Sequence, residues 1–338
     1  MPRICTPKPA DDLVVATADG LYCPAGDFHI DPWRPVQRAV ITHAHGDHLR
    51  PGSSRYITSA EGAALAARRL PQDAVVNAFA YGESFNLGAT IVSLHPAGHV
   101  LGSSQVRIEH EGAVWVVSGD YKRDPDPTCA PFEALQCDVF ISEATFALPA
   151  YHWPSPAGVA AEIHAWWQGN RARGAASVLF AYALGKAQRV LAELMPFTAE
   201  TVYLHGAVAN VTDVYRSQGI KMLPTLPVAD APVGKHSGAL IIAPPSAAGS
   251  AWMRRFGDCS TGFCSGWMRV RGDRRRRGYD RGFVLSDHAD WSSLLRTFSD
   301  SGARRILLTH GHGDTMSRYL REQGIDAAVM HTEYGAEE

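Results

Sequence analysis

The chain has 338 residues and a formal net charge of −2. This length allows about two domains with a large buried core, and the charge excludes a general polycation, so any binding of a polyanion requires a local basic patch. The first residues lack the apolar core of a signal peptide, and no apolar stretch is long enough to span a bilayer. We therefore expect a cytoplasmic protein with no membrane partner.

The first part of the chain has the pattern of short strands separated by turns. Its apolar runs are rich in β-branched and aromatic residues and are bounded by Gly, Pro or Asp. These runs predict strands at 13–16, 39–42, 89–94, 105–108, 113–117 and 138–142. One short helix is expected at 60–70, where Pro71 ends it.

Strands and helices alternate after about residue 149. Strands are expected at 177–182, 201–204 and 239–243, and helices at 157–168, 186–194 and 211–218. Such alternation predicts a small parallel sheet with helices on its faces.

The pattern changes back near residue 282, where a strand at 283–286, a helix at 292–298 and a strand at 305–309 follow. The expected fold class is α/β. We expect residues 1–147 and 282–338 to form one domain and residues 148–281 to form a second domain inserted into it.

The most informative motif follows the strand at 39–42. His43, His45, Asp47 and His48 place three histidines and one aspartate within six positions, with the small residue Gly46 in the turn. Imidazole and carboxylate groups are preferred ligands of zinc and similar divalent metals. Two adjacent ions at such a motif indicate hydrolysis of an ester, an amide or a phosphodiester. The alternative is a solvated loop that contains histidines, but this alternative fits poorly with a motif that directly follows a predicted strand.

Further polar residues stand at the ends of predicted strands, where loops gather ligands in layered α/β structures. They are His99, Asp120, Glu143, His288 and His310. Taken singly, each of them has an ordinary reading as a turn residue or a helix cap. Their occurrence together with the opening motif favours a common site.

These motifs carry a resemblance that covers nearly the whole chain. The His-x-His-x-Asp-His motif at 43–48 resembles the signature of the metallo-β-lactamase superfamily. The inserted domain and the segments at Glu143, His288 and His310 resemble its β-CASP branch, which comprises nucleases acting on DNA or RNA. The run at 180–189 and the short length look most like the bacterial ligase-associated DNA exonucleases. The resemblance implies an αββα sandwich with an inserted β-CASP α/β domain.

The resemblance also implies roles for individual residues. A first metal ion would be held by His43, His45 and His99, a second by Asp47, His48 and His310, and Asp120 would bridge them. Asp31 would orient the ligands, although an ordinary Asp-Pro turn explains it equally well on spacing alone. Two zinc ions are expected, with manganese as the alternative.

The function implied is a metal-dependent 5′-to-3′ DNA exonuclease in DNA repair. Its catalytic residues would be Asp47, His288 and Glu143, with His288 giving a proton to the leaving oxygen and Glu143 holding the other ring nitrogen. Single-stranded DNA or duplex ends are the expected substrate, with a DNA ligase and a helicase as functional associates.

Candidate phosphate contacts come chiefly from a stretch at 269–281 with seven arginines in thirteen residues. The candidates are Ser103, Ser104, Lys186, Arg271, Arg274, Arg275, Arg276 and Arg277. A solvated loop whose arginines pair with nearby acids is an equal alternative for the arginine stretch.

Two other functions remain open. An RNA-processing nuclease of the same branch is favoured by His310, because RNA-acting members typically carry histidine there and Artemis-like DNA enzymes often do not. A small-molecule metallo-hydrolase shares the opening motif but generally lacks the inserted domain and the His288 segment.

Overall fold

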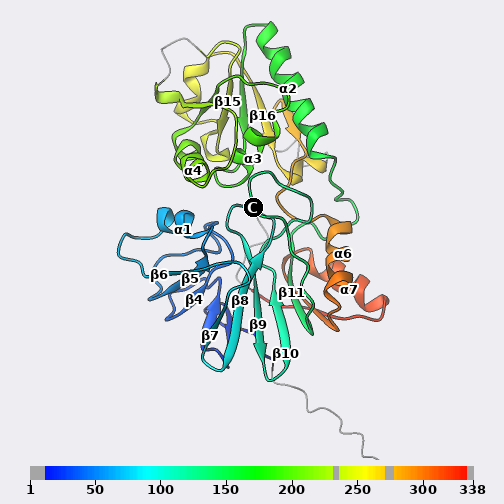
Figure 1. The fold of residues 1–338 in the computed structure, drawn as a ribbon. Coiled ribbons are helices and arrows are strands. Elements are labelled where there is room, and N and C mark those ends of the chain that lie inside the picture. Colours follow the sequence, from blue (N-terminus) through cyan, green and yellow to red (C-terminus); the bar gives the residue numbers. More distant parts are fainter. Residues whose placement is uncertain (1–11, 231–235, 271–277, 333–338) are drawn as a thin grey trace, which may run out of the picture.

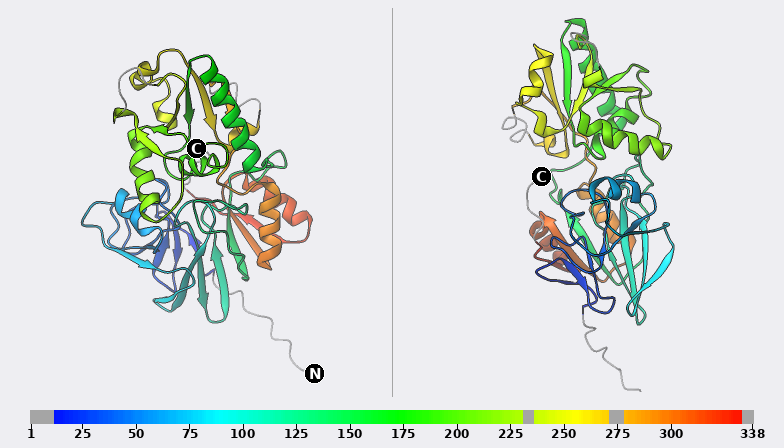
Figure 2. Two further views of the ribbon diagram at one scale, coloured as in Figure 1. Left: turned by 45° about the horizontal axis from the view of Figure 1, so that its top comes forward. Right: turned by 90° about the vertical axis from the view of Figure 1, so that its left-hand side faces the viewer.

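The computed structural model describes residues 12–230, 236–270 and 278–332. Two sheets face each other in one half of the molecule, and a third sheet with its helices forms the other half (Figure 1). Figure 2 shows the same two halves from two further directions. Mixed α/β architecture, the expected class, is confirmed.

The first sheet is built from the N-terminal part of the chain. Its six strands run in the order β1 (Val15–Ala16), β2 (Leu21–Cys23), β3 (Phe28–Ile30), β4 (Ala39–Val40), β5 (Tyr56–Ser59) and β6 (Val76–Phe79). From β3 onward the strands are parallel. The helix α1 (Ala63–Arg69) packs on this sheet through Leu65 and Ala66.

The second sheet joins distant parts of the sequence. Its seven strands are, in order, β19 (Asp326–Val329), β18 (Arg305–Gly311), β11 (Val139–Ala144), β10 (Ala113–Val117), β9 (Ser104–His110), β8 (Thr90–Pro96) and β7 (Ser84–Leu87). The strands β10, β11, β18 and β19 are parallel to their neighbours in that order, whereas β7 to β10 form an antiparallel meander.

Apolar side chains fill the space between these two sheets. Ile30, Val40 and Ile57 of the first sheet meet residues such as Val106 and Ile141 of the second. The outer face of the second sheet is covered by α6 (Trp291–Ser301) and α7 (Gly313–Glu322). The layers therefore run helix, sheet, sheet, helix.

The third sheet is entirely parallel, as the alternating pattern predicted. Its six strands are, in order, β14 (Thr225–Pro227), β13 (Val202–Leu204), β15 (Leu240–Ala243), β12 (Ala176–Phe180), β16 (Cys259–Cys264) and β17 (Arg281–Phe283). The helices α2 (Pro156–Ala172), α3 (Lys186–Glu193) and α4 (Gly206–Ser217) pack on one face.

Short 3₁₀ helices accompany the third sheet. They are η1 (Val228–Asp230), η2 (Pro245–Ala247), η3 (Ala251–Phe256) and η4 (Gly266–Arg269). Residues of η2, η3 and η4 pack in the core on the sheet face opposite α2 to α4.

Two elements near the site differ from the sequence prediction. The strand expected at 283–286 is β17 at 281–283, because its residues pair with 262–264 of β16. The strand β16 has a mixed polar pattern and was not predicted. It is a central strand because β12 and β17 flank it. The next residues, 284–290, are thereby free to form a loop that carries His288.

The predicted domain boundary between residues 281 and 282 falls inside β17, and the division into two domains stays a prediction. None of the described helices has the length and apolar character needed to cross a membrane.

Candidate metal centre

The polar residues singled out in the sequence come together between the two halves of the molecule. The strand β4 ends at Val40, two residues earlier than expected, and His43 and His45 lie in the loop that follows it. His99 lies in the loop between β8 and β9, and Asp120 lies just after β10. These loops follow the carboxyl ends of strands, where side chains from several strands converge.

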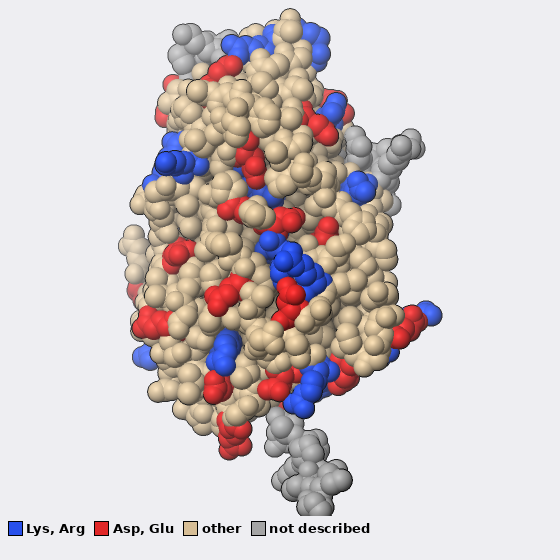
Figure 3. All heavy atoms as spheres, turned by 45° about the vertical axis from the view of Figure 1, so that its right-hand side comes forward, with Lys and Arg blue, Asp and Glu red and all other residues tan. Residues whose placement is uncertain are grey.

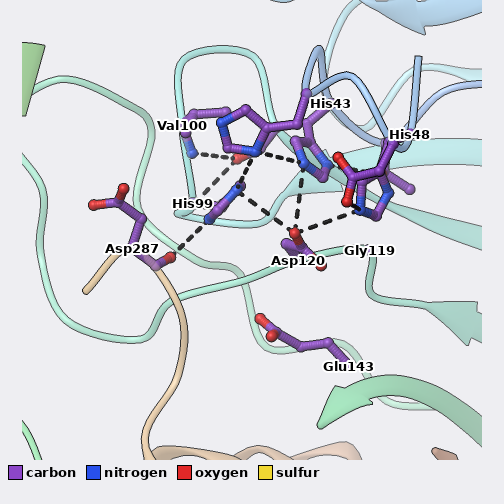
Figure 4. Close-up of polar contacts among 12 residues, drawn as sticks. His43, His48, His99, Val100, Gly119, Asp120, Glu143 and Asp287 are labelled. Atoms are coloured by element: carbon purple, nitrogen blue, oxygen red, sulfur yellow. Dashed lines mark hydrogen bonds and ion pairs between the residues drawn. The ribbon is translucent and has the colours of Figure 1, made fainter. Parts of the chain in front are cut away.

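Four of these residues form one compact group (Figure 4). The Nδ1 atom of His45 lies 3.0 Å from Nε2 of His43 and 3.1 Å from Nε2 of His99. The Oδ2 atom of Asp120 lies 3.6 Å from Nε2 of His43 and 3.8 Å from Nε2 of His99. Their ligand atoms all lie within 4.8 Å of one another.

The hydrogen bonds around His43 determine which of its nitrogens carries the proton. The Thr42 hydroxyl donates its only proton to Oδ2 of Asp31 at 2.5 Å. It must therefore accept from Nδ1–H of His43, which lies 3.0 Å away. The lone pair of His43 is then on Nε2, the atom that faces the group.

Backbone carbonyls fix the other two rings in the same way, since a carbonyl only accepts. Nε2–H of His45 donates to the carbonyl of Leu184 at 3.2 Å, and Nδ1–H of His99 donates to the carbonyl of Asp287 at 2.8 Å. The lone pairs are then on Nδ1 of His45 and Nε2 of His99. The short nitrogen contacts among the three histidines consequently join acceptors to acceptors, and they are not hydrogen bonds.

A second group also contacts Asp120. Nε2 of His48 is 3.5 Å from Oδ2 of Asp120 and 3.5 Å from Oδ2 of Asp47. Nε2 of His310 is 3.2 Å from Oδ1 of Asp120. Nδ1–H of His48 donates to Oδ2 of Asp31 at 2.8 Å, which leaves the lone pair of the neutral ring on Nε2.

His310 repeats the arrangement seen at His43. The Thr309 hydroxyl donates to the carbonyl of Ser142 at 3.1 Å and lies 3.2 Å from Nδ1 of His310. It therefore accepts from Nδ1–H of His310, and the Nε2 lone pair points to Asp120.

This set of donors fits divalent metal ions. The lone pairs of His43, His45 and His99 and the Asp120 carboxylate converge with no proton between them, an arrangement that repels unless a cation lies there. Burial lowers the pKa of His43 and of His99 well below the usual value, which keeps both rings in the neutral form that binds metal. Burial acts in the same direction on His48, but Asp120 and Asp31 raise its pKa well above the usual value.

Asp31 is the anchor of this arrangement. Its carboxylate accepts from the backbone N–H of Thr42 at 2.7 Å, as well as from the Thr42 hydroxyl and His48. Its φ of 43° lies in the left-handed region, which non-glycine residues rarely adopt and which concentrates at functional sites. The structure therefore distinguishes Asp31 from an ordinary turn aspartate.

Glu143 and His288 form a pair beside the metal group, with ligand atoms within 4.8 Å of one another and of Asp120. Oε2 of Glu143 accepts from Nδ1 of His288 at 2.8 Å and from the Thr145 hydroxyl at 2.6 Å. Oε1 accepts from the backbone N–H of Tyr121 at 2.8 Å. Both oxygens thus act as acceptors, as in an ionised carboxylate, and they hold the His288 ring 4.8 Å from the His99 ring.

A cavity of about 380 Å³ opens onto part of the metal group and onto His288. His45, Asp47 and His99 line it from the metal side, and His288 lines it next to them. Phe146 and Trp267 form an aromatic part of the wall, with ring centroids 4.7 Å apart. Arg69 also lines it, as does the ion pair of Lys186 with Asp287. The cavity therefore brings candidate metal ligands and a further histidine to one space.

Three of the predicted phosphate contacts lie among the described residues, namely Ser103, Ser104 and Lys186. Ser103 and Ser104 are buried and do not line the cavity. The Ser103 hydroxyl accepts from the backbone N–H of His99 and Val100, and Ser104 donates to the carbonyl of Thr42. Both serines hold the ligand loops through these hydrogen bonds, and their contact with phosphate stays a prediction. Lys186 lines the cavity, but its Nζ is 2.6 Å from Oδ2 of Asp287.

Five of the predicted arginine contacts lie outside the described residues: Arg271, Arg274, Arg275, Arg276 and Arg277. Their described neighbours Arg269 and Arg281 line a different pocket, where Arg281 lies 3.7 Å from Glu162. On the face shown in Figure 3, basic and acidic side chains are intermixed over the described surface.

The sequence analysis did not identify Thr42 and Thr309, whose hydroxyls set the protonation of the next residue. The signal was present, because Thr-His-x-His-Gly-Asp occurs at 42–47 and again at 309–314. The second copy resembles the first only in part. His310 lies near Asp120 as His43 does, whereas His312 stands directly before α7 and stacks on Tyr151.

Comparisons with known proteins give two relatives. The chain is 33% identical over 315 residues to a protein of Opitutus terrae named "Probable DNA ligase", a match that covers 93% of this chain and 30% of that protein. It is 30% identical over 202 residues to "Endoribonuclease ysh-1" of Neurospora crassa, covering 54% of this chain and 23% of that protein. The chain thus spans less than a third of the length of either relative.

No protein-family model matches the chain. Among solved structures, one titled as a protein of unknown function from Enterococcus faecalis V583 superimposes with a TM-score of 0.57. The match covers 88% of this chain and 80% of that one at 14% sequence identity, so it concerns the fold alone.

Proposed function

We propose that this protein is a metal-dependent nuclease of the β-CASP branch of the metallo-β-lactamase superfamily. The observation that carries the proposal is the convergence of the lone pairs of His43, His45 and His99 with Asp120, with the Glu143–His288 pair beside them. The names of the two relatives, a DNA ligase and an endoribonuclease, support a nucleic acid as substrate.

In this proposal residues 1–147 and 282–338 form the metallo-β-lactamase αββα domain, and 148–281 form the inserted β-CASP domain. The shared sheet supports it, because β18 and β19 pair beside β11 while β12 to β17 build a sheet of their own.

The ligand roles follow the two groups around Asp120. His43, His45 and His99 would hold one ion, and Asp47, His48 and His310 a second, with Asp120 between them. When bound, divalent ions supply Lewis acidity, which lowers the pKa of water and neutralises charge on a phosphate. The nitrogen-rich first group favours zinc, and the carboxylates of the second group also suit manganese.

His288 is proposed as the proton donor to the leaving oxygen. Glu143 accepts from Nδ1, so the carboxylate stabilises the charged form of the ring and directs Nε2 away from itself. Phe146, whose ring centroid is 5.8 Å from that of His288, shields this side from water. Glu143 is proposed to act through His288, because both carboxylate oxygens already accept hydrogen bonds from Tyr121, Thr145 and His288.

We further propose that the substrate is DNA, trimmed from a 5′ end in DNA repair, with a ligase and a helicase acting alongside. A region similar to nearly the whole chain forms 30% of a protein named as a DNA ligase, which supports DNA over RNA. The competing assignment is an RNA-processing nuclease, supported by the endoribonuclease relative and by His310 beside Asp120.

A time course on 5′- and 3′-labelled DNA and RNA, with zinc or manganese and an Asp47→Ala control, separates these functions. Release of mononucleotides from the 5′ end of DNA is the expected result. Cleavage of RNA alone would select the competing nuclease, and no cleavage of either polymer would reject a nuclease.

A further inference from the structure

A cluster of buried charges lies next to the metal centre and takes no part in the ligand set. It consists of Lys122, Asp126, Lys186, Arg189 and Asp287, each nearly inaccessible to solvent. Nζ of Lys122 is 2.7 Å from Oδ2 of Asp126, and Nζ of Lys186 is 2.6 Å from Oδ2 of Asp287. We refer to these five residues as the junction cluster, because they come from the loop after β10, from α3 and from the loop after β17.

Arg189 is the residue that ties the junction cluster together. Its side chain is 3% exposed, its Nε lies 3.3 Å from Oδ2 of Asp126, and its NH1 lies 3.5 Å from Oδ1 of Asp287. NH1 also donates to the backbone carbonyl of Ser286 at 2.6 Å. One guanidinium thus contacts both the loop after β10 and the loop after β17.

The carboxylates of the junction cluster are ionised. Burial acts to raise their pKa values, but Lys186 and Arg189 hold that of Asp287 far below its usual range, and Lys122 and Arg189 lower that of Asp126. Removing one partner of such a buried ion pair leaves an uncompensated charge. These ion pairs, with the hydrogen bond from Arg189 to the Ser286 carbonyl, therefore link the three segments that carry the cluster.

Two of the segments linked by the junction cluster supply backbone carbonyls that accept hydrogen bonds from two of the proposed metal ligands. His99 donates to the carbonyl of Asp287, as Figure 4 shows, and His45 donates to the carbonyl of Leu184, two residues before Lys186. The intervening Gly185 has a φ of +90°, and a Cβ there would lie 2.3 Å from Cγ1 of Val100. The turn before α3 is consequently packed against the loop that carries His99.

We propose that Arg189 is a positioning residue for the metal ligand His99. By holding Ser286 and Asp287 from α3, it fixes the carbonyl that keeps the His99 proton on Nδ1 and its lone pair on Nε2. Metal affinity at the group of His43, His45 and His99 then depends on a residue that contacts none of them and does not line the cavity.

The inference rests on the proposed metal centre and adds a coupling between it and the third sheet. It also changes the expectation for Lys186, which serves the junction cluster as the main counter-charge of Asp287. Arginine suits position 189 because its planar fork donates to Ser286 and Asp287 on one loop and lies within ion-pair distance of Asp126 on the other, whereas a lysine provides one point charge.

The test compares Arg189→Lys with the wild type in the full chain. Arg189→Lys keeps the buried charge but loses the fork, so it avoids the unfolding that Arg189→Met risks. Arg123→Lys is the matched control. That arginine is also mostly buried, with its NH2 2.7 Å from Asp300, and it holds α6.

Zinc affinity is measured by competition with a chromophoric chelator, and ligand geometry by the absorption spectrum of the cobalt-substituted protein. Arg189→Lys should weaken zinc binding about 10–100-fold, the usual effect of losing a partner that orients a ligand, and alter the cobalt spectrum. Arg123→Lys should do neither. In the nuclease assay Arg189→Lys should leave KM for DNA unchanged and should regain kcat as metal is added.

Wild-type zinc affinity and an unchanged cobalt spectrum in Arg189→Lys would overturn the inference. Equal weakening in both variants would also overturn it, because a general loss of stability would then explain the result. Neither measurement involves nucleic acid, so a wild type that binds metal but cuts no DNA would reject the proposed function and leave the inference intact. A wild type that binds no metal would reject both.

Discussion

Replacing Asp31 by asparagine should disable two metal ligands at once without removing either. The amide oxygen of asparagine still accepts from the backbone N–H of Thr42, but its NH₂ group is unable to accept from the Thr42 hydroxyl or from His48. The released Thr42 proton then turns to Nδ1 of His43, and the amide donates to Nδ1 of His48. Both rings are left with a proton on Nε2, the atom whose lone pair would bind the metal.

The expected magnitude follows from similar changes around metal sites. Losing one partner that orients a ligand typically costs 10–100-fold in affinity, or about 1.4–2.8 kcal/mol at 1.4 kcal/mol per factor of ten. Two rings are affected in Asp31→Asn, so the upper end of this range is expected. Competition with a chromophoric zinc chelator measures it directly.

Asp27→Asn provides the matched control. Asp27 also adopts a left-handed conformation, with a φ of 50°, and lies in the preceding turn, but its carboxylate accepts from the surface residues Tyr22 and Arg38 and contacts no candidate metal ligand among the described residues. Asparagine tolerates this backbone region, so neither variant should strain the chain. Zinc affinity in Asp31→Asn equal to that of Asp27→Asn would refute the protonation scheme.

Four further outcomes follow from the site. His45→Ala should lose both metal and cleavage, whereas His288→Ala should retain metal content and lose about 10²–10⁴-fold in kcat, as measured by elemental analysis and single-turnover kinetics; equal metal loss in both would contradict the roles. Glu143→Gln should lower kcat with little change in metal content, and a normal rate would remove the pair from the mechanism. Trp267→Ala should raise KM for single-stranded DNA by an amount corresponding to about 1–3 kcal/mol of lost base stacking, an effect that an abasic terminal nucleotide should abolish. Gly185→Ala should destabilise the fold by about 1–3 kcal/mol in denaturant unfolding, because its φ of +90° is strained for alanine.

Several residues of the candidate site could be identified from the sequence because they follow apolar runs. His43, His99, Asp120 and His310 were each identified after an apolar run, and the structure brings them together where those runs end. The parallel third sheet was also predictable, since strand and helix periods alternate regularly along it.

Other features depend on contacts that a linear pattern does not contain. Arg189 is placed in the junction cluster by ion pairs with residues 63 and 98 positions away, Asp126 and Asp287. Ser103 was predicted to contact phosphate, and its hydroxyl accepts hydrogen bonds from two backbone N–H groups of the His99 loop. The strand β16 lacks a strand-like pattern and is held in place by neighbours on both sides.

Titration of the metal-free protein with zinc or manganese, while nucleotide release from labelled single-stranded DNA is followed, tests the central claim most directly. Cleavage should be absent without metal, rise with added metal and level off at about two equivalents per chain, as expected for ions shared across Asp120. Cleavage by the metal-free protein at the full rate, or metal binding at two equivalents with no cleavage of DNA or RNA, would contradict the account.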